Sequence, residues 1–172
     1  MSSTAATAPG EARESWVPMI AIALGQAIMS FNVASLPVSL GGMVQSFGVP
    51  PTTVATGIVM YSLAVAGFVM LGAKLGQKHG ATTVFRWSTA LLLLASALTA
   101  FSPSFGMLLA AQGLAGLGAA LLLPSLVVLI TDNYSGPQQA KAIGLLGGVQ
   151  AAATVATILI AGTVGTHLGW RY

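Results

Sequence analysis

Long runs of apolar residues, almost free of charge, constrain this chain more than any other feature. An apolar helix needs about 20 residues to cross the hydrocarbon core of a bilayer, and stretches of this kind lie at 17–40, 52–72, 83–101, 105–131 and 142–164. Charged residues make up only 5% of the chain, against roughly 25% in a soluble domain. A soluble fold would therefore expose a large apolar surface. We predict an all-α integral membrane protein with about five transmembrane helices.

The segment before the first apolar run is polar and rich in small side chains. A secretory signal would open with basic residues and a short apolar core, which this segment does not have. We expect residues 1–15 to form a disordered cytoplasmic tail. Residues 16–172 are expected to form one five-span membrane bundle.

The distribution of basic residues indicates an orientation. The stretch 72–86, between the second and third spans, holds Lys74, Lys78, His79 and Arg86, and no acid. Lys and Arg resist translocation, so a basic loop of this kind is expected on the cytoplasmic side. This places the uncharged loop at 41–51 outside, and it predicts a multi-pass protein of the cell membrane with a cytoplasmic N-terminus. The net charge of +3 is too small to indicate nucleic acid as a partner.

No arrangement of side chains that would carry enzymatic chemistry is visible in the sequence. The chain has no cysteine, which excludes a disulfide, a thiol nucleophile and a thiolate metal site. His79 and His167 are expected at opposite membrane surfaces, and the hydroxyl residues have no base near them. No phosphate-binding loop occurs. We predict that the protein is not an enzyme and that it uses no cofactor or metal.

Small residues recur four positions apart in the later spans, which lets a neighbouring helix approach closely. Ordinary packing within a multi-span bundle is the commonest reason for such a pattern. The positions that we expect to pack helices together are Gly116, Ala120, Gly144 and Gly148.

Several short motifs resemble those of major facilitator superfamily transporters. The run 73–82, AKLGQKHGAT, is similar to the family's loop between the second and third spans, roughly G-x-L-a-D-R-x-G-R-K. The run 111–124, AQGLAGLGAALLLP, resembles the fourth-span pattern R-x-x-q-G-x-g-a-a…P. The run 32–37, NVASLP, is similar to the N-V-A-L-P signature of the drug:proton antiporter branch with about fourteen spans (EmrB/QacA-like). The fifth-span motif of that branch is eroded, because Thr157-Ile158 stands in the place of its Gly-Pro pair.

The resemblance covers residues 16–172, and it implies a fold of two six-span halves with a substrate site between them near the midplane. By this reading the chain resembles the N-terminal half without its sixth helix. The implied partners are the lipid bilayer, a complementary C-terminal half or a second copy of the chain, and a small hydrophobic substrate.

In the family, the loop after the second span acts as a conformational latch. Its positions correspond here to Leu75, Gly76, Gln77, Lys78 and Gly80. Gln77 stands where the family has Asp, so a latch without that charge should be weaker. The alternative is a turn that only sets topology, with its bases close to anionic lipid headgroups.

No ionisable side chain lies at mid-depth in the expected spans, although such residues usually mark proton pathways. Gln112 also replaces the Arg of the fourth-span motif, so proton antiport by the family's usual route is not expected. The remaining polar groups are amides, and a buried amide without a partner costs roughly 1–3 kcal/mol. Two roles stay open for them, which are lining the substrate cavity and bonding between helices. The candidates are Gln26, Asn32, Gln112 and Gln150.

Two functions follow from these observations. The first is membrane transport by alternating access, with the chain as the N-terminal portion of a drug-efflux-like transporter. The alternative is a truncated, non-transporting membrane protein that packs with or modulates a partner transporter. The neutral residues at the charged motif positions favour the alternative, whereas flux that depends on the amides would exclude it.

Overall fold

A computed structural model describes the backbone of residues 15–167 and side chains up to residue 165. The expected tail at 1–15 lies almost wholly outside the described residues, and so does the side chain of His167. Within the described part the chain is helical and contains no strand. The helices are α1 Val17–Phe47, α2 Pro51–His79, α3 Ala81–Ala100, α4 Phe105–Asn133 and α5 Gly136–His167. All five are long and apolar enough to cross a membrane, which confirms the predicted fold class.

The connections between helices are shorter than the sequence predicted. α1 continues through Pro37 to Phe47, so the expected loop at 41–51 shrinks to residues 48–50. α2 continues to His79, so the expected loop at 72–86 is wrong, and only Gly80 separates α2 from α3. A membrane favours such continuation because an unbonded backbone group is costly in lipid. Lys side chains can also extend from a helix to the headgroups without ending it.

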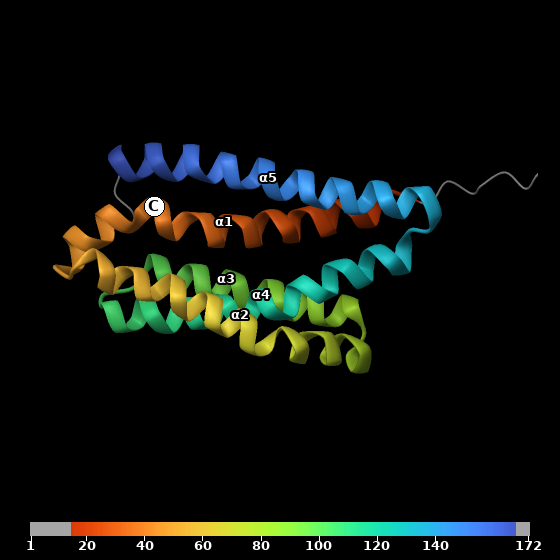
Figure 1. The fold of residues 1–172 in the computed structure, drawn as a ribbon, viewed down its shortest axis with the longest axis horizontal. Helices are drawn as coiled ribbons and strands as arrows, with labels where there is room; N and C mark the ends of the chain where they lie inside the picture. Colours follow the sequence, from red (N-terminus) through yellow and green to blue (C-terminus); the bar gives the residue numbers. More distant parts are fainter. Residues whose placement is uncertain (1–14, 168–172) are drawn as a thin grey trace, which may run out of the picture.

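The helices form two groups (Figure 1). α1 and α5 lie side by side in one group, and α2, α3 and α4 form the other. The most extensive contacts join α4 to α2 and to α3, followed by those between α1 and α5. α4 is accordingly the most buried helix, whereas α5 leaves most of its surface uncovered in the described bundle.

Contact between α2 and α4 depends on glycine. A Cβ atom built at Gly116 would lie 2.5 Å from the carbonyl oxygen of Tyr61 and 2.7 Å from the Cβ atom of Ala64. On α2, a Cβ atom built at Gly72 would overlap the carbonyl oxygen of Ala120. Only hydrogen side chains allow the two backbones to approach this closely.

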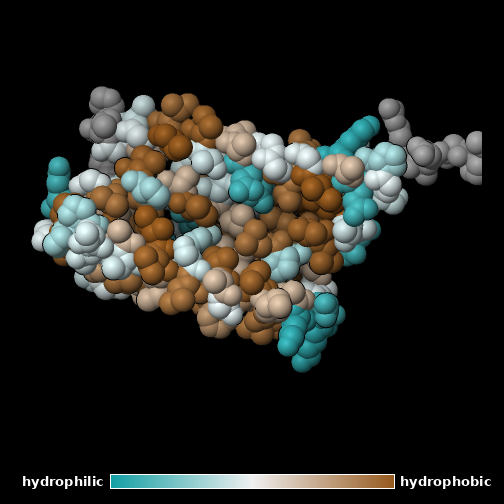
Figure 2. All heavy atoms as spheres, in the orientation of Figure 1, coloured by the Kyte–Doolittle hydropathy of each residue, from teal (hydrophilic) through white to brown (hydrophobic). Residues whose placement is uncertain are grey.

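The small residues of α5 lie differently. A Cβ atom built at Gly144 or Gly148 would meet nothing within 4 Å, and both residues are exposed. The expectation that they pack helices together is therefore not met within this bundle, because α5 turns this side away from α1. The surface agrees with a membrane environment: Figure 2 shows hydrophobic side chains over most of the middle of one face, with most hydrophilic ones gathered towards the two ends.

Candidate functional site

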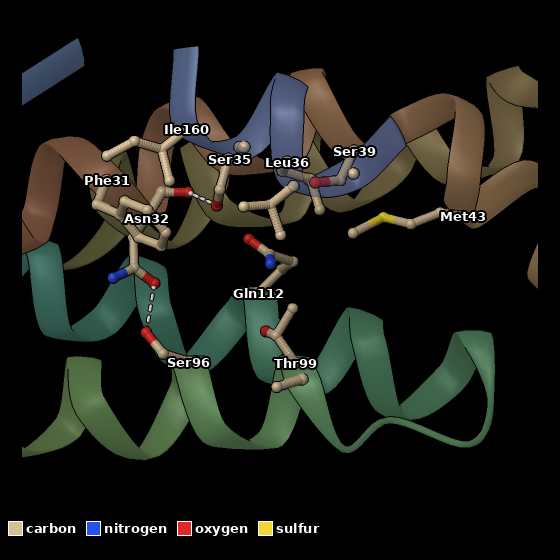
Figure 3. Close-up of a pocket in the computed structure, with 14 residues that line it drawn as sticks. Phe31, Asn32, Ser35, Leu36, Ser39, Met43, Ser96, Thr99, Gln112 and Ile160 are labelled. Atoms are coloured by element: carbon tan, nitrogen blue, oxygen red, sulfur yellow. Dashed lines mark hydrogen bonds between the residues drawn. The ribbon is translucent and has the colours of Figure 1, made fainter. Parts of the chain in front are cut away.

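A cavity of about 250 Å³ lies between the two groups of helices. Polar side chains from three helices line it, together with apolar residues from α1 and α5 (Figure 3). The polar residues are Asn32, Ser35 and Ser39 from α1, Ser96 and Thr99 from α3, and Gln112 from α4. The apolar walls include Phe31, Leu36, Met43, Ile160 and Val164. None of the described residues that line the cavity is ionisable.

Asn32 forms a fixed part of the cavity wall. Its Nδ2 atom donates a hydrogen bond of 3.1 Å to the carbonyl oxygen of Ile28. The Ser96 hydroxyl lies within donating distance of Asn32 Oδ1, at 3.1 Å, and of the Leu92 carbonyl oxygen, at 2.9 Å. Its contact with Asn32 joins α1 to α3 (Figure 3). Because both ends of the amide are bonded within the protein, Asn32 has limited freedom to turn towards another molecule.

Gln112 has the opposite arrangement. Its side chain is 5% exposed, and its amide forms no hydrogen bond with any residue in the described part of the chain. Figure 3 shows the amide pointing from α4 towards α1, into the space beside Leu36. Because the amide atoms face the cavity and are not fully enclosed, a molecule inside the cavity can bond to them.

A second cavity of about 80 Å³ lies on the α2 side of the same residues. Asn32, Leu36 and Gln112 line both cavities, and the smaller one adds Ile58 and Tyr61 from α2. Its position makes Gln112 part of the partition between the two spaces. Movement of this side chain would therefore change the volume available on either side.

The structure separates the four predicted amides. Asn32 and Gln112 share the cavity wall, whereas Gln26 is buried and donates from Nε2 to the Ser30 hydroxyl at 3.3 Å. Gln150 is exposed on α5 and lines neither cavity. The four amides were candidates for lining the cavity or for bonding between helices. Gln26 instead has a partner one turn along its own helix, and Gln150 is exposed on α5.

Hydroxyl residues of the wall were not among the predicted site residues. Ser35 and Ser39 are four residues apart on α1, and Ser96 and Thr99 are three apart on α3. Such spacings place both members of a pair on one helix face. This periodicity was the available signal, although hydroxyls in transmembrane helices commonly bond to their own backbone, as Thr99 does to the Ala95 carbonyl at 2.9 Å.

The predicted latch residues lie at the end of α2. Leu75, Gly76, Gln77 and Lys78 are helical, and Gly80 carries the turn with a φ of +84°, a value that disfavours other residues. Across this turn the rings of His79 and Trp87 are 5.8 Å apart. Lys78 and Arg86 form no ion pair with another described residue, so any latch here lacks an internal ionic contact.

The bundle is packed tightly at the end where α1 begins. Tyr134, which follows α4, is 1% exposed and its ring centroid lies 5.2 Å from that of Trp16. The Tyr134 hydroxyl accepts from the Met19 N–H and donates to the Ser15 carbonyl, each at 3.1 Å. Beyond it, apolar residues of α1 and α4 fill the space. The larger cavity therefore lies in the opposite half of the bundle, towards the connections at 48–50 and 101–104.

Comparison with known proteins identifies the family. A family model described as Major Facilitator Superfamily matches residues 22–172. The chain belongs to the major facilitator superfamily. This confirms the resemblance seen in the motifs, and it makes the five helices a partial major facilitator fold in a multi-pass membrane protein.

Relatives of this major facilitator chain include proteins named for drug transport and resistance. It is 28% identical to the major facilitator superfamily multidrug transporter mfsC of Aspergillus fumigatus, over 66% of the chain and 22% of that protein. It is 31% identical to the puromycin resistance protein pur8 of Streptomyces alboniger, over 67% of the chain and 23% of that protein. The riboflavin transporter RibZ of Clostridioides difficile is 20% identical over 92% of the chain. The chain spans between 22% and 35% of the length of these relatives.

Proposed function

We propose that this chain forms the N-terminal portion of a drug-efflux-like major facilitator transporter, and that its larger cavity contributes to the substrate site. The observation that carries the proposal is the amide of Gln112, which is buried, has no partner in the described bundle and faces the cavity. The family membership supports transport in general. The relatives' names include a multidrug transporter, an antibiotic resistance protein and a riboflavin transporter, so they indicate small organic substrates without selecting one.

The mechanism that fits this arrangement is alternating access, in which two bundles move around a central site. Such movement needs a second bundle, either a complementary C-terminal half or another copy of the chain. The uncovered surface of α5, with its small residues, is a suitable contact for it. With the N-terminus in the cytoplasm, the packed end at Tyr134 closes the inner side and the cavity lies towards the outside.

Within this mechanism the end of α2 acts as the latch between the two bundles. Gln77 is exposed at this end, where it can donate and accept hydrogen bonds but brings no charge. Compared with a family member that has Asp at this position, the latch should hold less firmly.

The test is efflux from cells that produce the native gene product, with or without single substitutions. A panel of fluorescent hydrophobic dyes serves as the probe. We expect Gln112→Leu to reduce efflux by about tenfold or more, because the loss of one buried polar contact weakens binding by roughly that factor. Gln150→Leu removes an amide outside the cavity and should leave efflux unchanged. If removing the gene changes the efflux of no dye in the panel, the non-transporting alternative is correct and the proposal fails.

A further inference from the structure

We propose that the larger cavity selects a small, uncharged molecule that presents a hydrogen-bond donor and acceptor side by side, as a carboxamide or lactam does, and that Gln112 is the residue that recognises this pair. The inference rests on the proposed function, because it names the substrate class of the same site. Four properties of the cavity support it: the free amide, the absence of charge, the size and the apolar walls.

The free amide defines the polar part of the ligand. In the described part of the chain, every fully enclosed polar side-chain atom has a hydrogen-bond partner. Gln112 has none although its side chain is 5% exposed, so its amide must open onto the cavity, as Figure 3 shows. A carboxamide offers donors on nitrogen and an acceptor on oxygen in one plane. Such a group can bind an adjacent donor and acceptor through two bonds at once, as Asn and Gln bind adenine edges.

Asn32 does not compete for this role. Its two amide atoms are engaged by the Ile28 carbonyl and the Ser96 hydroxyl, both at 3.1 Å. The contact with Ser96, whose hydroxyl also faces the Leu92 carbonyl oxygen, joins α1 to α3. Asn32 is therefore a positioning residue, and Gln112 is the group left to contact the ligand.

The absence of charge decides between neutral and ionic ligands. No described residue that lines the larger cavity is ionisable, and the smaller cavity adds only the phenol of Tyr61, which carries no charge at neutral pH. An ion that enters such a space loses hydration without gaining an opposite charge, which is strongly unfavourable. The amide of Gln112 and the hydroxyls of Ser39 and Thr99 can replace hydrogen bonds to water, but they cannot compensate a full charge.

Size and lining define the apolar part of the ligand. A dry cavity of about 150 Å³ is enough for a benzene ring, so 250 Å³ admits a ring with one amide. Phe31, Leu36 and Ile160 present apolar surface for the ring.

The test uses three probes of one shape, which are benzamide, benzamidinium and benzoate. Their binding to the purified protein in lipid nanodiscs is measured by equilibrium dialysis at pH 8. We expect benzamide to bind about tenfold to hundredfold more tightly than either ion, since a good bidentate pair is worth that factor. Gln112→Leu should remove this advantage while binding of toluene persists. Gln150→Leu, the matched control, should behave as the wild type.

A second variant covers the case in which Gln112→Leu does not fold. Gln112→Glu keeps the size of the side chain, and it should reverse the preference towards benzamidinium. A purely structural role of Gln112 would not produce a reversal. Equal or tighter binding of an ion to the wild type, no saturable binding of benzamide, or unchanged selectivity in both variants would overturn the inference.

Flux measurements separate this inference from the proposed function. Cells that expel dyes through the cavity without any preference for neutral molecules would leave transport standing and overturn the substrate class. Selective binding of benzamide in a protein that expels nothing would support the ligand class and overturn the proposed transport function.

Discussion

Tyr134 shows how one side chain can hold two distant segments together. Its hydroxyl is bonded to the backbone of residues 15 and 19, and its ring contacts Trp16. Residues more than 110 positions apart in the sequence are thus joined at the packed end of the bundle. The sequence contained no signal for this contact, because Tyr134 follows a helix at a point that resembles an ordinary connection.

Removal of the Tyr134 hydroxyl tests whether its hydrogen bonds stabilise the packed end of the bundle. We expect Tyr134→Phe to lower the free energy of unfolding by about 1–2 kcal/mol, because two hydrogen bonds in a buried place are lost at about 0.5–1.5 kcal/mol each. The N–H of Met19 keeps a second acceptor, the Trp16 carbonyl at 3.1 Å, which moderates the loss. Unfolding in mixed micelles provides the measurement.

Tyr61→Phe is the matched control for Tyr134→Phe. It removes the same atom from a tyrosine whose hydroxyl has no partner among the described residues, so its effect should be close to zero. Equal losses in both variants would show that the hydrogen bonds of Tyr134 contribute nothing specific.

The amides illustrate what residue-level reasoning could and could not predict. Their presence in apolar spans marked them as candidates, and two of the four do line the cavity. The sequence could not predict whether each amide faces lipid or the neighbouring helices, because a transmembrane helix is apolar on the lipid side as well as on the protein side. Gln150 could be assigned to the outer side of α5 only after the packing of the helices was known.

At the scale of the helices, hydropathy predicted the number of spans correctly and their ends poorly. The first two apolar runs stop at residues 40 and 72, but their helices continue to Phe47 and His79. Backbone hydrogen bonding, rather than side-chain polarity, decides where a helix ends in a membrane. Gly48 and Gly80 mark the true ends, each with a positive φ.

The glycine contact between α2 and α4 gives a prediction for this scale. We expect Gly116→Ala to destabilise the bundle by about 1–3 kcal/mol, because the new methyl group meets the Tyr61 carbonyl and neither backbone can yield easily. Gly148→Ala is the control, since nothing lies within 4 Å of its added methyl group and helical glycine is less stable than alanine by about 0.5–1 kcal/mol. It should therefore be neutral or stabilising.

Both variants can be compared by unfolding in mixed micelles. A stable Gly116→Ala protein would mean that the α2 and α4 backbones do not approach each other closely at Gly116.

For the whole molecule, the orientation in the membrane is open to a direct measurement. The absence of cysteine allows single cysteines to be introduced at exposed positions, such as Thr52 near the start of α2 and Gln77 near its end. With a cytoplasmic N-terminus, we expect Thr52→Cys to react with a membrane-impermeant maleimide in intact cells, because the positive-inside rule places it outside. Gln77→Cys should react only after the membrane is permeabilised. The reverse pattern would contradict the proposed orientation.

The packed end at Tyr134, and the cavity in the opposite half of the bundle, also determine where the membrane potential falls. A space open to solvent stays close to the potential of the solution on its side, so most of the voltage falls across the packed end. Moving one elementary charge through the full voltage involves about 2.3 kcal/mol per 100 mV. An uncharged molecule that leaves this cavity does no electrical work. Depolarising the cells should therefore not change the movement of the uncharged substrate proposed above through this part of the protein.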